Sequence, residues 1–181
     1  FMMLERIREK VSEGATFTDA QASVRATTVF TTHTPVMAGH DIFTAQLIDK
    51  YFTRYLKSLG ISRELFMQLG KQDTAQTFNM TAFALRTANH SCAVSQLHET
   101  VARKMWQGLW PGVPEDKVPI THVTNGVHVS SWIAPEIYYL FEKYLGDDWI
   151  TRHDDTKLWE RILTIPNTEF WTVHQLLKRK L

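Results

Sequence analysis

Asn125 is the residue whose setting most clearly indicates ligand binding. It lies in the segment Thr124–His128, directly after the apolar run Val118–Val123. A strand that ends in Asn-Gly places a short amide and a permissive backbone at the rim of a sheet, where ligands bind in open α/β folds. The alternative is a turn, in which Asn125 and Gly126 are used because both tolerate positive φ.

A second strand end carries His33 and Thr34. The β-branched stretch 27–32 runs directly into these two residues and then into Pro35. Ends of parallel strands meet at one edge of a sheet, so the two segments predict a single ligand-facing edge. An imidazole and an amide at that edge can donate hydrogen bonds to the hydroxyl groups of a ligand.

The remaining histidines and the cysteine do not form a recognisable catalytic or metal pattern. His33 and His40 are seven residues apart, and His90 and His98 are eight apart, so neither pair has the i, i+4 spacing of a helical zinc site. We interpret His98 as a partly buried structural residue and Cys92 as a small packed one. The sequence has no glycine-rich phosphate loop, no G-x-S-x-G motif and no paired carboxylates.

Three tryptophans have two possible roles. Trp106, Trp110 and Trp132 could form a platform on which a sugar stacks. Tryptophan near helix ends belongs more often to a core or an interface, so we favour the packing role.

Composition limits the class of protein. A length of 181 residues with 44% hydrophobic and 22% charged residues fits one soluble domain. The formal net charge of +1 gives no basis for binding nucleic acid or an anionic membrane. One cysteine excludes an internal disulfide and indicates a cytoplasmic location, and no apolar run is long enough to span a membrane. Phe1 before Met2 is unusual for a natural start and indicates an excised piece or a cloning remnant.

The elements around these residues are mostly helical. Asn89–Ala93 is small and polar enough to be a kink or a crossing loop, and the strands are 27–32 and the run that ends at Asn125. Such a chain predicts an α/β fold with a small parallel sheet, helix-rich and partly uncovered, as in a piece of a larger protein. Helices are expected over 4–13, after a capping box at 18–21, over 41–59 with Gly60 as its stop, over 79–87, from Val94 toward Trp110, from Pro135 to Gly146, over 154–162 and after a cap at Asn167.

Three ordered motifs, spread over roughly residues 20 to 181, resemble the α-glucan (glycogen and starch) phosphorylases, in particular their shorter bacterial and archaeal branch. They are Val29–Asp41, Phe78–Thr81 with Leu85-Arg86 and Val94–His98, and His122–His128 with Trp132.

The resemblance implies a fold and a reaction. The fold is a Rossmann-like domain of the glycosyltransferase B type, and residues 1–181 form a single partial domain, the later part of the N-terminal one. The family cleaves terminal α-1,4-glucosyl units of glucans such as maltodextrin with inorganic phosphate, giving glucose 1-phosphate. It uses pyridoxal phosphate, held by a lysine of the second domain, which this chain lacks. The chain is therefore expected to be inactive alone and to self-associate, with no catalytic, cofactor-binding or metal-binding residue of its own.

Residue roles also follow from the resemblance. Asn125 matches the asparagine that binds the sugar 6-hydroxyl, and His33 with Thr34 matches the neighbouring strand end. Asn89 and His90 begin a segment that matches the one lying against the glucosyl ring. Most family members read Val-Asn-Gly-Val there, whereas this chain reads Ser-Cys-Ala-Val over 91–94, which removes an amide donor and a permissive backbone position.

Two other functions stay open. One is a retaining glucosyltransferase of the same fold that uses a nucleotide sugar, similar to starch synthase. The other is a non-catalytic module for glucan binding or assembly. The sequence encoded after Leu181 separates these, because a downstream cofactor lysine supports the phosphorylase and a natural stop near Leu181 supports the module.

Overall fold

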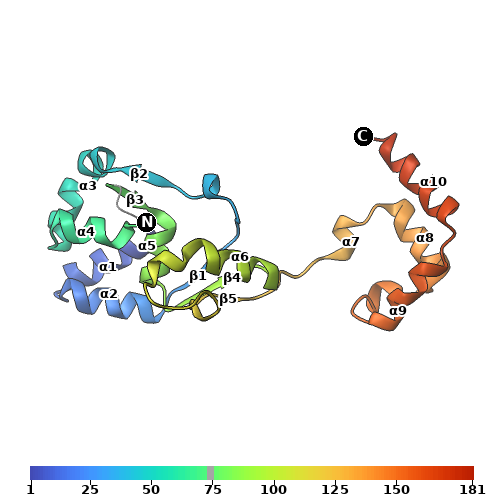
Figure 1. Cartoon of the computed structure of the whole chain (residues 1–181), viewed down its shortest axis with the longest axis horizontal. Helices are drawn as coiled ribbons and strands as arrows, with labels where there is room; N and C mark the ends of the chain where they lie inside the picture. Colours follow the sequence, from blue (N-terminus) through green and yellow to red (C-terminus); the bar gives the residue numbers. More distant parts are fainter. Residues whose placement is uncertain (73–75) are drawn as a thin grey trace. The chain divides into compact units, whose positions relative to one another are not determined.

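The structure is a computed structural model that describes residues 1–72 and 76–181. It divides into two compact units, Phe1–Asn125 and Gly126–Leu181, whose elements are labelled in Figure 1. The sequence predicts one partial domain over 1–181, and whether both units belong to one domain of a longer protein stays a prediction.

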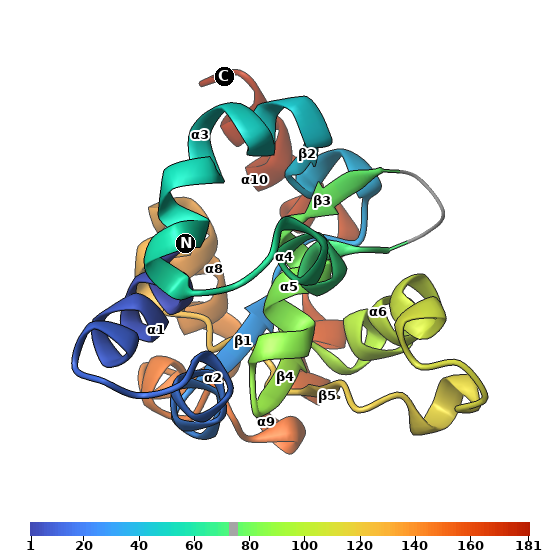
Figure 2. The same cartoon turned by 90° about the vertical axis from the view of Figure 1, so that its left-hand side faces the viewer.

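A small parallel sheet organises the first unit. Its strand order is β1 (Val29–Thr32), β4 (His90–Ala93) and β5 (Thr121–His122). Thr32 pairs with Ala93, and Ala93 pairs with His122, so the three strands run side by side in the same direction (Figure 2). The predicted class, a helix-rich α/β chain with a small parallel sheet, is confirmed.

The central strand is a correction to the sequence analysis. Residues 89–93 were expected to form a kink or a crossing loop, yet His90–Ala93 is β4 and pairs on both sides. Ser91 and Ala93 are buried, which only small side chains allow where a helix packs closely on the strand. Composition favours a loop here, but pairing with two flanking strands decides the conformation.

The run Val118–Val123 is also less regular than expected. Only Thr121–His122 forms strand β5, whereas Val118 and Ile120 are 1% and 0% exposed and belong to the core. The apolar residues of this run therefore serve mainly to pack the core before the strand begins, and the strand itself is shorter than the run.

Helix α3 (Ala45–Leu59) begins four residues later than predicted. Residues Ile42–Thr44 form β2, which pairs antiparallel with β3 (Thr77–Asn79). The Thr44 hydroxyl accepts the Leu47 amide at 3.3 Å and so caps the helix at its N-terminus. Gly60 ends the helix with φ 67°, as the sequence predicts.

Most other helices of the first unit begin at a side-chain cap. Thr16 caps α2, not Thr18 as the predicted capping box requires, and its hydroxyl accepts the Asp19 amide. Asn79 and Ser95 cap α5 and α6 in the same way. The remaining helices of this unit are α1 (Met2–Ser12), α2 (Phe17–Ala26), α4 (Arg63–Gly70), α5 (Met80–Thr87) and α6 (Gln96–Trp106).

Two hydrophobic cores stabilise this unit. The first lies among α1 to α5 and is rich in stacked aromatic rings, and the ring centroids of Phe66 and Phe78 are 4.7 Å apart. The second joins α5, β4 and α6 around Trp106 and Ile120. Burying this apolar surface, at about 25 cal/mol per Å², is the main stabilising contribution.

Helix α6 turns a different face inward from the one its apolar spacing predicts. The expected stripe contains Leu97, which is 77% exposed. The buried positions are His98, Ala102 and Trp106, one residue further along the chain. His98 was expected to be partly buried and is 8% exposed, so its burial is confirmed and its structural role stays a prediction.

The second unit is helical. Its core is formed by Leu145, Trp149 and Leu158. The expected helix over 154–162 is α-helical only as far as Glu160 and continues as a 3-10 turn, Arg161–Thr164. Asn167 is the first residue of the last helix, not its cap, because Pro166 precedes it at the capping position. The helices are α7 (Val129–Trp132), α8 (Pro135–Leu145), α9 (Thr156–Glu160) and α10 (Asn167–Lys178).

Candidate functional site

The carboxyl ends of β1, β4 and β5 bring three of the predicted site residues to one edge of the sheet. His33 and Thr34 directly follow β1, and Asn125 lies three residues beyond the end of β5. The parallel registers place Thr32, Ala93 and His122 in one row. The two strand ends therefore share one edge of the sheet in the first unit, as the sequence predicts, and the role of that edge in ligand binding stays a prediction.

Backbone pairing continues past β5 and fixes the main chain of Asn125. The Val123 amide donates to the Ala93 carbonyl at 3.0 Å, and the Asn125 amide donates to the Val94 carbonyl at 3.0 Å. The Asn125 side chain is exposed. Among the described residues positive φ angles occur only at glycines, and Gly126 is not one of them. The structure thus gives no support to the alternative in which Asn125 and Gly126 are chosen for a positive-φ turn.

The loop after β1 is compact around Thr34. Its hydroxyl accepts the Val36 amide at 3.3 Å. Gly39 passes so close that a Cβ there would lie 2.7 Å from Thr34 Cγ2. Thr34 is half-buried, whereas His33 is exposed. The loop therefore holds the threonine firmly and leaves the imidazole free to meet a ligand.

His40 anchors the far end of this loop in the core. Its Nδ1 lies 2.7 Å from Thr81 Oγ1, and its ring packs edge-on against Trp106 with centroids 5.0 Å apart. Burial lowers the pKa of His40, and the neighbouring His98 lowers it further. The imidazole is therefore neutral near pH 7, and its role is structural.

Asn89 and His90 lie at the opposite end of the sheet from Asn125. The Asn89 amide donates to the Thr28 carbonyl at 2.9 Å, and His90 pairs with Val29 at the start of β1. The structure does not bring these two residues to the carboxyl edge with the others. Their role in substrate binding stays a prediction, and it would require the substrate to contact a part of the sheet other than the carboxyl edge.

The departure from the family motif at 91–93 falls inside β4. Ser91 and Ala93 are buried, and Cys92 Sγ lies 3.3 Å from Thr31 Oγ1. These three side chains pack within the sheet, in agreement with the interpretation of Cys92 as a small packed residue.

The tryptophan platform is not formed as a single surface of the first unit. Trp106 is 1% exposed and Trp110 packs against the same core. Trp132 is 81% exposed and belongs to the second unit. The packing role that we favoured is correct for Trp106 and Trp110.

Sequence reasoning missed an ion-pair network on α6 beside the edge. The Glu99 carboxylate contacts Arg103 Nη2 at 2.5 Å and also His122 Nδ1. The i, i+4 spacing of Glu99 and Arg103 in the sequence is the pattern that could have predicted the ion pair between them. The contact with His122 is long-range and has no signature in the sequence.

The side chains at the edge could bind hydroxyl groups. An exposed amide and an exposed imidazole can hydrogen-bond to hydroxyl groups. Within residues 1–72 and 76–181 no group of three or more His, Cys, Asp or Glu side chains is placed to hold a metal ion. No helix in the same ranges is both long enough and apolar enough to cross a membrane.

Comparison with known proteins gives the chain its relatives. No family model matches it. It is 39% identical over 180 residues to the maltodextrin phosphorylase of Thermococcus litoralis, covering 99% of this chain and 21% of that protein. It is 36% identical over 183 residues to the glycogen phosphorylase of Aquifex aeolicus, covering 100% of this chain and 26% of that protein. The glycogen phosphorylase of Mycobacterium tuberculosis is also 36% identical, over 188 residues, with 100% and 21% coverage.

The chain therefore spans about a fifth to a quarter of the length of the curated relatives it matches. The resemblance indicated by the sequence motifs is confirmed, and over its whole length the chain corresponds to a part of the α-glucan phosphorylases.

Proposed function

We propose that this chain supplies part of the glucosyl-binding site of an α-glucan phosphorylase. The observation that carries the proposal is the carboxyl edge of the parallel sheet, which gathers His33, Thr34 and Asn125. Asn125 binds the 6-hydroxyl of the terminal glucosyl unit, and His33 with Thr34 borders the same subsite. Similarity along the whole chain to proteins named glycogen or maltodextrin phosphorylase supports this assignment.

The parent reaction would cleave the terminal α-1,4-glucosyl unit of a maltodextrin with inorganic phosphate to give glucose 1-phosphate. In that reaction the residues of this chain bind and orient the sugar. The lone cysteine supports a cytoplasmic enzyme.

Pyridoxal phosphate would belong to another part of the parent protein. No lysine among the described residues is buried, so none has the enclosed setting of a cofactor imine. The residues present do not fit the cofactor, and we assign no step of the reaction to it here. The isolated chain is accordingly expected to release no glucose 1-phosphate.

At the level of fold, we propose that the first unit is a piece of a Rossmann-like domain of the glycosyltransferase B type. Its support is the parallel order β1-β4-β5 with α6 connecting β4 to β5. Both outer strands have a free edge within the described residues, and Val29 on β1 is 65% exposed. Exposed apolar surface of this kind also favours self-association of the chain, which sedimentation at high protein concentration measures. A strictly monomeric species would contradict the self-association.

A nucleotide-sugar glucosyltransferase and a non-catalytic glucan-binding module remain the alternatives. The full-length product of the gene separates all three when it is given maltoheptaose with phosphate or, separately, ADP-glucose with a glucan primer. Glucose 1-phosphate release supports the phosphorylase, and ADP release supports the alternative transferase. Glucan binding with neither product supports the module.

A further inference from the structure

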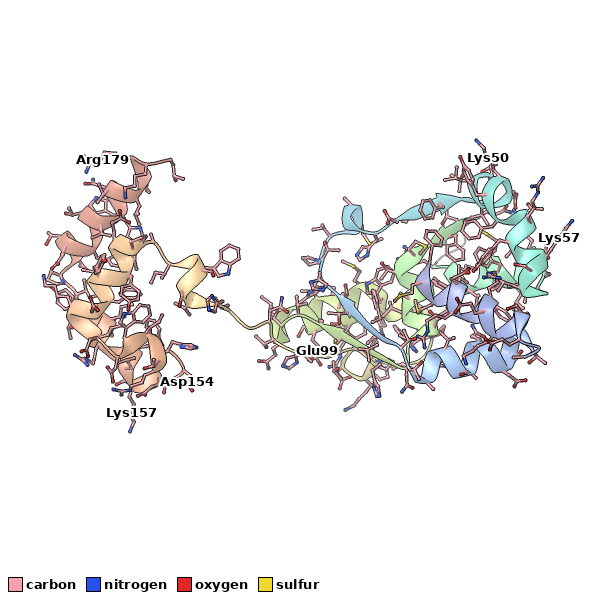
Figure 3. All side chains as sticks on the ribbon, turned by 180° about the vertical axis from the view of Figure 1, so that it is seen from behind. Lys50, Lys57, Glu99, Asp154, Lys157 and Arg179 are labelled. Atoms are coloured by element: carbon pink, nitrogen blue, oxygen red, sulfur yellow. The ribbon has the colours of Figure 1, made fainter. Side chains whose placement is uncertain are left out.

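Glu99, in the first turn of α6, holds two cationic or hydrogen-bonding side chains at once. One carboxylate oxygen lies 2.5 Å from Arg103 Nη2, and the other contacts His122 Nδ1. The Glu99 and Arg103 side chains are only 14% and 23% exposed, whereas that of His122 is 37% exposed. Figure 3 labels Glu99 on the ribbon of the first unit. We call Glu99, Arg103 and His122 the Glu99 clamp.

The Glu99 clamp adds side-chain contacts to a short strand whose other supports are the buried Ile120 before it and the backbone bonds to β4. β5 contains two residues and is an outer strand of the sheet, and among residues 1–72 and 76–181 its one strand partner is β4. Arg103 Nε donates to the Ile120 carbonyl at 2.8 Å, immediately before the strand. The side chain of His122, at the end of the strand, contacts Glu99. Helix α6 therefore holds the backbone before β5 and the side chain at its end.

The held segment leads directly to the candidate sugar contact. His122 is followed by Val123, whose amide bonds to Ala93, and two residues later Asn125 bonds to Val94. Short edge strands open locally at a lower free energy than the core, so we expect these two bonds to depend on side-chain contacts that hold the strand. We propose that Glu99 is a positioning residue, which sets the place of Asn125 at the carboxyl edge through His122 and Arg103. This inference rests on the proposed function of that edge.

Partial burial makes the Glu99 clamp stronger than a surface ion pair. Fully exposed pairs are screened by water and salt and contribute little. Glu99 is largely withdrawn from solvent, and hydrogen bonds to charged groups contribute more than neutral ones. Removing its charge while keeping its shape should therefore loosen the segment 120–125 without emptying the core.

The test compares Glu99→Gln with Glu64→Gln in the full chain. Glu64 is an exposed carboxylate in the first turn of α4, so it controls for the loss of a negative charge near a helix N-terminus. Amide hydrogen exchange is followed by NMR at Val123 and Asn125, with the Asn89 amide at the other end of the sheet as an internal reference. We expect exchange at Val123 and Asn125 to accelerate about five- to tenfold in Glu99→Gln, with Asn89 unchanged. Affinity for maltoheptaose, measured by calorimetric titration, should fall with it.

Four outcomes overturn the inference. Unchanged exchange at Val123 and Asn125 removes the positioning role, as does equal acceleration at Asn89, which indicates a general loss of stability. Equal acceleration in Glu64→Gln attributes the effect to the helix end. Faster local exchange with undiminished glucan affinity removes the link to the sugar edge.

A second variant keeps the test possible if Glu99→Gln does not fold. If Glu99→Gln does not fold, His122→Val removes the same contact from the exposed partner and takes its place. Absence of maltoheptaose binding by the unaltered chain would count against the proposed function, while the exchange comparison still decides whether Glu99 positions Asn125.

Discussion

Replacing Gly39 with alanine tests whether the loop beside the candidate site depends on a close contact with Thr34. A Cβ on Gly39 would lie 2.7 Å from Thr34 Cγ2, 2.8 Å from Oγ1 and 3.1 Å from Cβ. Rotation of the Thr34 side chain relieves the first two contacts. It leaves the third, because Cβ moves only with the main chain, so the loop must shift by a few tenths of an ångström. Gly39 is not in the left-handed region, so the contact alone causes the effect.

Stability should respond little to this change. Overpacking costs about 1–3 kcal/mol in a well-packed core, and we expect the lower end because Gly39 itself is exposed and Thr34 is only half-buried. Replacing glycine also reduces the entropy of the unfolded chain, which stabilises the protein by about 0.4–1 kcal/mol. The two contributions nearly cancel. Affinity for glucan is the sharper measure, and a loss of about 0.5–1.4 kcal/mol in binding raises the Kd about two- to tenfold.

The assay is calorimetric titration with maltoheptaose, combined with NMR shifts of residues 33–40. Gly108→Ala is the matched control, since nothing lies within 4 Å of a Cβ at that position. We expect shifts confined to the loop and weaker binding in Gly39→Ala, with neither change in Gly108→Ala. Parental affinity in Gly39→Ala, or equal weakening in the control, would refute the argument that Thr34 must keep its place.

Three further predictions follow from the same structure. Gly70→Ala places a Cβ 2.5 Å from the buried Phe78 ring, and this clash outweighs the gain in helix propensity. The free energy of unfolding in urea should therefore fall by about 1–2 kcal/mol, and stability equal to that of Gly108→Ala would be inconsistent with this. Burial holds the pKa of His40 below 6.5, so below that pH the unfolded state binds more protons than the folded state. The contribution of His40 to the free energy of unfolding is therefore complete above pH 6.5 and should decrease as the pH falls. If the urea midpoint of His40→Phe declines with pH in the same way, His40 is not the cause. Asn125→Ala in the full-length enzyme should lower kcat/KM for phosphorolysis about ten- to a hundredfold, from about 1.5–3 kcal/mol for one hydrogen bond, and undiminished preference for glucosyl over xylosyl acceptors would reject the sugar contact.

Local signals in the sequence were sufficient for the long helices. The apolar step of four with Gly60 predicted the end of α3, and Pro135 with Gly146 bounded α8. The predicted start of α3 was wrong, because Phe43 also fits the apolar stripe of the helix. In the structure Phe43 belongs to β2 and pairs with Phe78 of β3, which is distant in the sequence. Strand pairing, unlike helical periodicity, depends on partners that a local pattern does not contain.

The same cause explains the missed centre of the sheet. Residues 90–93 are small and polar, and their conformation is decided by bonds to β1 and β5. Once β4 is recognised as a strand, its direction separates Asn89 from Asn125, since parallel strands place their first residues at one end and their last at the other. The motif match grouped these residues, but only the topology shows that they occupy opposite ends.

Asn125 is the position at which sequence and structure most clearly favour a ligand over a structural explanation. Its main chain is already fixed by the bond from its backbone N–H to the Val94 carbonyl, and any residue other than proline could make that bond. Its backbone does not need an asparagine, because φ is not positive, and its side chain is exposed. An exposed amide that neither caps a helix nor closes a left-handed turn contributes little to folding. Because the backbone beside it is held on two sides, by β4 and by the Glu99 clamp, the fold maintains the place of a side chain that it does not itself use. That combination is expected of a residue kept for a contact with a ligand.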